Sequence, residues 1–233
     1  MTASWKAIDE RAGLYELEKV VETGWCWRAL AVRLTGGSSL LVSPIRGTLA
    51  RTAEALEAIG TPSAALAPNH FHYMGLREAR ERYGDLACVA SGTAAPRLTA
   101  KCGHDFASLD ALRERLPSSV TLLEPPGTKT GEVWLRVETD GGVAWAVCDA
   151  FFSVSRPLSG MMGLVLRATG TAPGLRIGST FLWLALADRR AYRRWLEERL
   201  EEDAPRVLVP SHGDVIHDEA LPERLRELAA RRL

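Results

Sequence analysis

Short apolar segments of strand length alternate with amphipathic segments of helical period along much of this chain. Residues 29–34 and 39–42 are apolar runs separated by Gly36-Gly37, a pattern typical of a β-hairpin. Residues 48–59 then place apolar side chains at near-helical spacing, and Gly60 stands where a helix ends. Because helices in such an alternation cover the faces of sheets, the pattern predicts a layered α/β protein.

Most of the remaining chain shows the same alternation of strand-length and helical segments. Residues 153–179, with five glycines and two prolines, give no clear assignment. No repeat, low-complexity tract or Ser/Gly linker is present, so we expect one domain over residues 1–233. The further strands expected are 64–67, 86–90, 120–123, 132–137, 143–148 and 206–209, and the further helices are 75–83, 108–116 and two near the end, around residues 192–200 and 221–228.

The charges of the chain balance. Lys plus Arg and Asp plus Glu are both 29 among 233 residues, which gives no electrostatic reason to expect a nucleic-acid or anionic-membrane partner. No stretch approaches the about 18 apolar residues of a membrane span. The N-terminal residues include Lys6, Asp9, Glu10 and Arg11, which argues against a signal peptide and predicts a cytoplasmic protein. We therefore expect its partner to be a small-molecule substrate or ligand.

The four cysteines, Cys26, Cys88, Cys102 and Cys148, show no spacing typical of structural zinc. We expect reduced thiols, most of them buried. The tryptophans in strand or helix patterns are expected in the core, with the alternative that several of them line a pocket. They are Trp25, Trp27, Trp134, Trp145, Trp183 and Trp195.

Histidines supply the first chemical signal. His70 and His72 follow a short apolar strand, and residues two apart in extended backbone project to the same side. Two imidazoles placed this way can bind one metal ion at the usual Zn–N distance of about 2.0–2.1 Å. The alternative is a pair of surface or hydrogen-bonded loop residues. His104 and His217 are interpreted as loop or surface residues.

Two more polar residues stand at the ends of predicted strands. Asp149 follows strand 143–148, and His212, within Ser211-His212-Gly213, follows strand 206–209. Each can equally be a cap or turn residue. Functional groups of layered α/β proteins nevertheless collect at strand ends, where several loops converge.

The order of these motifs resembles the metallo-β-lactamase fold. The resemblance implies a four-layer αββα sandwich, with two mixed β-sheets, helices outside and a metal site at one sheet edge. More narrowly, Ser43-Pro44-Ile45, residues 67–72 and Tyr83-Gly84-Asp85 resemble an uncharacterised branch of that superfamily with a degraded HxHxDH motif.

The departures from the family pattern concern the metal ligands. Met74 and Gly75 occupy the positions of the Asp and the third His of HxHxDH, and Thr128 replaces the histidine of the Pro-Gly-His loop. Lys129 is either an exposed loop residue or a partner for Asp149. The resemblance therefore retains four of seven ligand positions, which are His70, His72, Asp149 and His212.

The four retained ligand positions limit the number of metal ions that the chain can bind. The resemblance implies at most one divalent metal, with zinc, iron(II) or manganese all suited to two histidines and a carboxylate, and a metal-free protein is the other outcome. We expect at most a mononuclear hydrolase of a small ester, thioester, lactone or phosphoester, with Asp149 and His212 as the catalytic residues. The alternative is a catalytically silent member of the superfamily that acts as a binding or interaction protein.

Overall fold

The computed structural model describes residues 4–21, 25–155, 159–171 and 173–233. Its larger sheet has the order β1-β2-β3-β4-β5-β6, with antiparallel neighbours from β1 to β4 and parallel neighbours from β4 to β6. The strands of this sheet are β1 (Trp5–Asp9), β2 (Leu14–Val20), β3 (Cys26–Arg33), β4 (Ser39–Val42), β5 (Pro62–Leu66) and β6 (Ala87–Val89).

The second sheet has the order β13-β12-β9-β8-β7, and its β9–β12 pair is parallel while its other neighbours are antiparallel. A separate antiparallel pair is formed by β10 and β11. The strands are β7 (Val120–Leu123), β8 (Trp134–Thr139), β9 (Gly142–Val147), β10 (Phe152–Val154), β11 (Gly174–Arg176), β12 (Val207–Pro210) and β13 (Ile216–His217).

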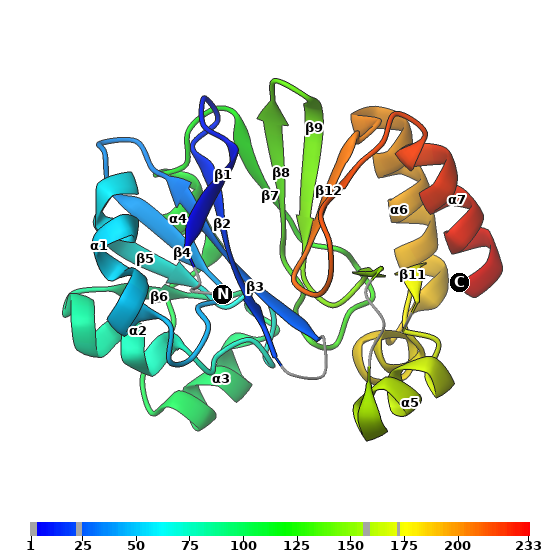
Figure 1. Cartoon of the computed structure of the whole chain (residues 1–233), viewed down its shortest axis with the longest axis horizontal. Coiled ribbons are helices and arrows are strands. Elements are labelled where there is room, and N and C mark those ends of the chain that lie inside the picture. Colours follow the sequence, from blue (N-terminus) through cyan, green and yellow to red (C-terminus); the bar gives the residue numbers. More distant parts are fainter. Residues whose placement is uncertain (1–3, 22–24, 156–158, 172) are drawn as a thin grey trace.

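Helices lie on the outer face of each sheet (Figure 1). The helices α1, α2 and α3 cover the first sheet, and α6 and α7 cover the second. The helices are α1 (Leu49–Ile59), α2 (Leu76–Tyr83), α3 (Ala95–Cys102), α4 (Leu109–Arg113), α5 (Gly160–Ala168), the π-helix η1 (Phe181–Ala185), α6 (Arg189–Asp203) and α7 (Leu221–Arg232).

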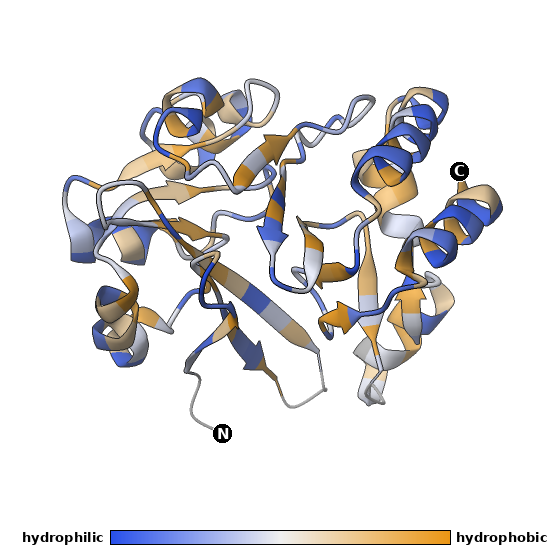
Figure 2. Ribbon diagram, turned by 90° about the horizontal axis from the view of Figure 1, so that it is seen from above, coloured by the Kyte–Doolittle hydropathy of each residue, from blue (hydrophilic) through white to orange (hydrophobic). Residues whose placement is uncertain are grey.

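The alternation of side chains along the strands explains the layers. Leu135 and Val137 of β8 face the core between the sheets, whereas Trp134 of the same strand packs beneath α6. Both faces of the strand are therefore buried, as expected for a sheet with helices outside and a second sheet inside. Figure 2 shows the outcome, with apolar strands in the middle and polar residues along the outer helices. The predicted four-layer arrangement of two mixed sheets is confirmed.

The sequence patterns missed several elements. The pair β1–β2 is absent from the prediction because β2 carries three charged side chains, Glu16, Glu18 and Lys19. Residues 153–179, which had no assignment, contain β10, α5 and β11 in their described part. None of the described helices combines the length and the apolar composition needed to cross a lipid bilayer.

The cysteine expectation is confirmed and the tryptophan expectation only partly. All four thiols are free, with three buried and Cys102 half-buried. Trp134 and Trp145 are fully buried, but Trp183 is 68% exposed and Trp27 is 38% exposed. The core position is therefore wrong for Trp183, which lies on the π-helix Phe181–Ala185, whereas Trp27 lines a cavity, as the alternative allowed.

Backbone hydrogen bonds join the two sheets at one edge. The Arg28 N–H of β3 donates to the Ser211 carbonyl after β12 at 2.9 Å. The His70 N–H after β5 donates to the Thr130 carbonyl before β8 at 3.1 Å. The loops at this edge are therefore held by bonds from both sheets.

Arg28 adds a side-chain link at the same edge. Its buried guanidinium donates to the Pro210 carbonyl at 2.5 Å and to Glu16 Oε2 at 2.6 Å, and a second carboxylate, Glu18, lies 3.8 Å away. A buried charge of this kind is tolerated because it is both paired and hydrogen-bonded.

We expect Arg28→Met to lower the free energy of unfolding by about 3 kcal/mol, since it leaves Glu16 and the Pro210 carbonyl without their donor. Chemical denaturation measures the change. Lys6→Met, on an exposed position of β1, is the matched control and should stay within about 0.5 kcal/mol of the parent. Equal stability of Arg28→Met and the control would contradict this role.

Candidate metal centre

The predicted site residues stand on loops that follow parallel strands. His70 and His72 come after β5, Asp149 after β9 and His212 after β12. Val147 of β9 is paired with Pro210 of β12, so the two strands end level with each other. This register brings the residues that follow them to the same edge of the second sheet.

Three of the predicted residues converge there. His72 Nε2 lies 3.3 Å from Asp149 Oδ1, and His212 Nε2 lies 3.4 Å from the same oxygen. The ligand atoms of the three residues all lie within 4.8 Å of one another. Asp149, His72 and His212 thus form the candidate metal centre.

Neighbouring groups orient both imidazoles. His212 Nδ1 lies 3.1 Å from the Cys26 carbonyl oxygen, which only accepts, so the ring donates from Nδ1. Nε2 is therefore the nitrogen left to face Asp149 or to bind a metal ion. His72 Nδ1 lies 2.6 Å from Ser43 Oγ, so its Nε2 is also directed at the carboxylate. Both arrangements match the outer hydrogen bonds that metal-binding histidines make.

The carboxylate of Asp149 is held from its other side by an amide. Asn69 Nδ2 donates to Asp149 Oδ2 at 2.7 Å, which leaves Oδ1 to the two imidazoles. Burial alone would raise the pKa of the Asp149 carboxyl. The neighbouring His72 and His212 outweigh it and hold that pKa well below its usual range, so the group is a carboxylate.

These distances fit a metal ion. Two ligand atoms about 2.0–2.2 Å from one tetrahedral ion lie about 3.4 Å apart. The two N–O separations of 3.3 and 3.4 Å match this value, and both exceed the about 2.7–2.9 Å of a charge-assisted hydrogen bond. The donor set of two imidazoles and one carboxylate is therefore suited to a divalent cation.

The structure places His70 outside this group. Its Nε2 lies 3.3 Å from Arg97 Nη1 on α3, and burial together with the Arg97 charge lowers the pKa of the imidazole. A neutral ring beside a guanidinium offers its lone pair to that cation. His70, predicted as a metal ligand, thus has a hydrogen-bond partner where the prediction expects an ion.

Lys129, His104 and His217 do not take part in the metal centre. Lys129 donates to the Trp183 carbonyl at 2.8 Å and is exposed, which agrees with the loop interpretation rather than with a pairing to Asp149. His217 lies in β13, and His104 stacks on Phe106, both away from the metal centre.

Sequence reasoning assigned no role to three residues that position the centre, which are Ser43, Asn69 and Glu132. Ser43 has a φ of 50°, unusual for a residue other than glycine. This conformation at the end of β4 accompanies the contact of its hydroxyl with His72. The dipeptides Ser43-Pro44 and Pro68-Asn69 were the sequence signals for Ser43 and Asn69, since proline and asparagine favour turns.

Glu132 is a fully buried carboxyl directly beneath Asp149. Its Oε1 accepts from Trp134 Nε1 at 2.7 Å and from the Ala150 N–H at 3.1 Å, while Oε2 has no partner among the described residues. Burial and then the charge of Asp149 raise the pKa of Glu132 to about 8. At neutral pH the group is thus a neutral acid that holds the loop after β9.

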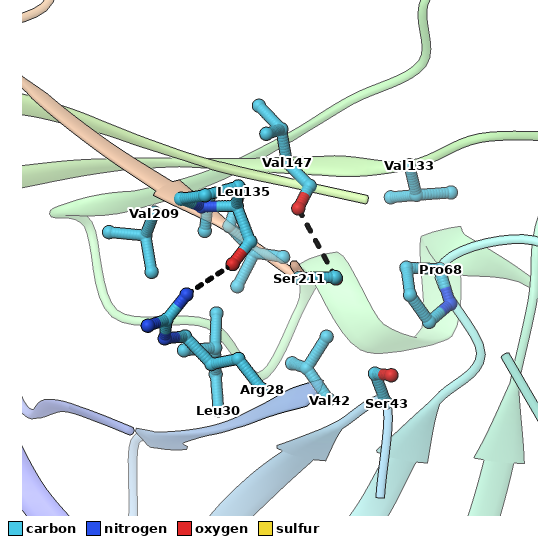
Figure 3. Close-up of a pocket in the computed structure, with 12 residues that line it drawn as sticks. Arg28, Leu30, Val42, Ser43, Pro68, Val133, Leu135, Val147, Val209 and Ser211 are labelled. Carbon is cyan, nitrogen blue, oxygen red and sulfur yellow. Dashed lines mark hydrogen bonds between the residues drawn. The ribbon is translucent and has the colours of Figure 1, made fainter. Parts of the chain in front are cut away.

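Two cavities adjoin the centre. The smaller, of about 10 Å³, lies between the sheets, where Arg28 and Ser43 face Val147 and Ser211 (Figure 3). The larger has about 670 Å³ and contains His72, Asp149 and His212 in its wall. Its volume lies within the about 300–1,000 Å³ typical of small-molecule sites.

Solved structures resemble this arrangement. A metallo-beta-lactamase from Erythrobacter litoralis superposes with a TM-score of 0.65 and 16% identity, covering 99% of this chain and 97% of that one. FIM-1 from Pseudomonas aeruginosa in its mono-zinc form gives 0.63 and 15%, covering 99% and 96%. A flavo di-iron protein mutant from Thermotoga maritima gives 0.57 and 15%, covering 98% of this chain and 61% of that one.

The chain has the metallo-β-lactamase fold. This confirms the fold expected from the order of the sequence motifs. No protein-family model and no curated protein sequence matches the chain. At 15–16% identity the structures show the fold alone, so the chemistry has to be argued from the residues of this chain.

Packing explains one departure from the ligand pattern of this fold. A Cβ added at Gly75 would lie 2.1 Å from the Pro44 carbonyl oxygen, so α2 begins against the loop after β4 with no space for a side chain. Met74, in contrast, is 55% exposed. The close approach of the two backbones therefore excludes a histidine at position 75.

We expect Gly75→His to lower the free energy of unfolding by at least about 3 kcal/mol, because the Pro44 loop has to move. Met74→Asp, at the neighbouring exposed position, is the control and should change stability by less than about 1 kcal/mol. Thermal or urea denaturation compares the two. A Gly75→His protein as stable as Met74→Asp would show that the close approach at Pro44 is unimportant.

The buried Glu132 should make the free energy of unfolding depend on pH. Between about pH 5 and pH 8 the folded chain keeps a proton on Glu132 that the unfolded chain loses, so this group makes stability fall as the pH rises through that window. Glu132→Gln mimics the neutral acid and removes that fall, so its stability relative to the parent should increase from pH 5.5 to pH 9.

Urea denaturation at several pH values measures this difference. Glu54→Gln, at an exposed position of α1, is the control and should follow the parent at every pH. A constant difference between Glu132→Gln and the parent would mean that Glu132 is charged at neutral pH.

Proposed function

We propose that this chain is a mononuclear metal-dependent hydrolase whose metal is held by His72, Asp149 and His212. The observation that carries the proposal is the placement of Asp149 Oδ1 at 3.3 and 3.4 Å from two imidazole nitrogens that other groups orient toward it. Three protein ligands with an open position are the usual set of a catalytic zinc site.

Zinc, iron(II) and manganese all suit two imidazoles and a carboxylate. The neighbour FIM-1, solved in a mono-zinc form, supports zinc as the first metal to test. When bound, such an ion acts as a Lewis acid that polarises a substrate oxygen and lowers the pKa of water.

The chain itself supplies orientation. The Ser43 hydroxyl and the Cys26 carbonyl fix the two rings, and the Asn69 amide fixes the carboxylate. Removing such outer partners typically costs about 10–100-fold in metal affinity. The buried Glu132, beneath the loop that carries Asp149, limits movement of that loop.

Few groups near this centre can accept a proton from water. Among the described residues that line the larger cavity, Asp149 is the only carboxylate. The exposed thioether of Met74 accepts hydrogen bonds poorly, and His212 is committed to Cys26 through Nδ1. Because Nε2 of His212 is a proposed metal ligand, Asp149 is the group left to orient water and accept its proton, so we expect slow turnover.

The substrate we propose is a small ester, thioester, lactone or phosphoester. The cavity of about 670 Å³ next to the centre accommodates a molecule of that size. An alternative is a silent family member that binds a ligand without turning it over. The contact between Arg97 and His70 favours it, because a guanidinium occupies the partner position of a predicted ligand.

Metal binding is the direct test. We expect one zinc ion per chain by elemental analysis of protein purified without chelators. We also expect at least about 100-fold weaker zinc binding in His72→Ala, Asp149→Ala and His212→Ala, because each loses a direct ligand. His70→Ala is the matched control and should keep zinc affinity within about threefold of the parent.

Activity then separates the two functions. The protein is assayed on a panel of esters, thioesters, lactones and phosphodiesters with added zinc, iron(II) or manganese. We expect turnover below about 10 per second, the typical enzyme median. This turnover should disappear in His212→Ala. Zinc binding without any turnover would favour the silent binding protein. Two tightly held ions, or unchanged zinc affinity in all three ligand variants, would contradict the mononuclear site.

A further inference from the structure

We infer that the larger cavity recognises a substrate with an anionic group and an apolar body, and that Lys19 and Arg46 are the residues that bind the anion. This inference rests on the proposed function, because it concerns the cavity that contains His72, Asp149 and His212. It adds a substrate class that the metal ligands alone do not specify.

The cavity wall has an excess of positive charge away from the metal centre. Lys19, Arg28 and Arg46 line it, and Asp149 is its one acidic residue among those described. Arg28 is neutralised by Glu16 at 2.6 Å. Neither Lys19 nor Arg46 has an ion pair within the described part of the chain, so both charges are available to a ligand.

Lys19 is held at the cavity wall by two contacts. It lies on β2 directly opposite Trp27 of β3, and its ammonium is 6.0 Å from the centre of the Trp27 ring. Nζ also donates to the Arg46 carbonyl at 3.0 Å. An ammonium has three donors, so further N–H groups remain for an anion.

The loop that carries Arg46 is also anchored. Glu78 of α2 accepts from the Gly47 N–H at 2.5 Å and from the Leu49 N–H at 3.0 Å. The Arg46 carbonyl is the acceptor for Lys19, so the backbone of this loop and the ammonium are tied together. The Lys19 ammonium and the backbone at Arg46 are thereby held on one wall of the cavity, which reduces the conformational freedom that binding has to remove from Lys19.

Apolar side chains surround these cations. Trp27, Phe71 and Met74 are 38%, 40% and 55% exposed, and all three line the same cavity. Large apolar side chains left exposed together are typical of a ligand-binding surface. The wall thus fits an amphipathic anion, with a carboxylate or a phosphate as the charged group.

Ligand binding tests the inference without relying on catalysis. The probes are 4-phenylbutyrate, 4-phenylbutyl phosphate and the neutral 4-phenylbutanamide, titrated by two-dimensional NMR into chelator-treated full-length protein. We expect both anions to bind at least about tenfold more tightly than the amide, and this preference to shrink when salt is raised from about 0.05 to 0.5 M.

Single substitutions identify the residues responsible. Lys19→Gln and Arg46→Gln should each weaken anion binding by at least about fivefold and leave amide binding within twofold. Lys6→Gln and Arg51→Gln remove the same charges at exposed positions outside the cavity and are the controls. Preference for one anion over the other would distinguish a phosphate from a carboxylate ligand. Equal binding of the amide and both anions, or no binding of any probe, would overturn the inference.

A kinetic comparison separates this inference from the proposed function. Two chromogenic esters serve as substrates with zinc added, the anionic mono-4-nitrophenyl glutarate and the uncharged 4-nitrophenyl butyrate. Lys19→Gln should raise KM for the anionic ester at least fivefold more than it raises KM for the uncharged ester, and the control Lys6→Gln should give the same KM ratio for the two esters as the parent. Absence of turnover with anion-selective binding would refute the hydrolase and leave the anion site standing. Turnover with the same KM effect on both esters would refute the anion site alone.

Discussion

The carboxylate of Asp149 is the group on whose interactions the site depends. Its side chain is only 20% exposed, and a carboxylate so largely removed from water is tolerated only when partners compensate for the lost hydration. Two imidazoles face Oδ1, and an amide donates to Oδ2. The partners come from loops of both sheets, so the geometry of the centre depends on how the sheets pack. The parallel pairing of β9 with β12 positions Asp149 and His212, because it ends the strands that precede them at the same level.

The same edge also explains why the fold keeps polar groups in its interior. Arg28 links β3 to the end of β12, Glu132 lies under the loop after β9, and Ser43 holds a left-handed conformation beside His72. Each of these groups is tolerated in the interior because it has partners there. Together they hold the ligand-bearing loops in place, which is the arrangement expected of a preorganised site.

The fold could be predicted from sequence because apolar periodicity reports burial directly. The strands β7, β8, β9 and β12 and the helices α1, α6 and α7 follow this rule. The pair β1–β2 could not, since the charged side chains of β2, Glu16 and Lys19 among them, interrupt the apolar pattern. In the site, their positions after strands made His72, Asp149 and His212 candidates, and the family resemblance then implied that they are metal ligands. The contact of His70 with Arg97 was not, because it depends on where α3 packs, and no local pattern of residues reports that distance.

The central claim is that a single ion is bound by His72, Asp149 and His212. Anomalous X-ray diffraction from crystals grown with zinc, measured on both sides of the zinc edge, tests it most directly. We expect one anomalous peak per chain, about 2 Å from Asp149 Oδ1 and from the Nε2 atoms of His72 and His212, with His70 still beside Arg97. A peak coordinated by His70, or a second peak of similar height in the same cavity, would contradict it.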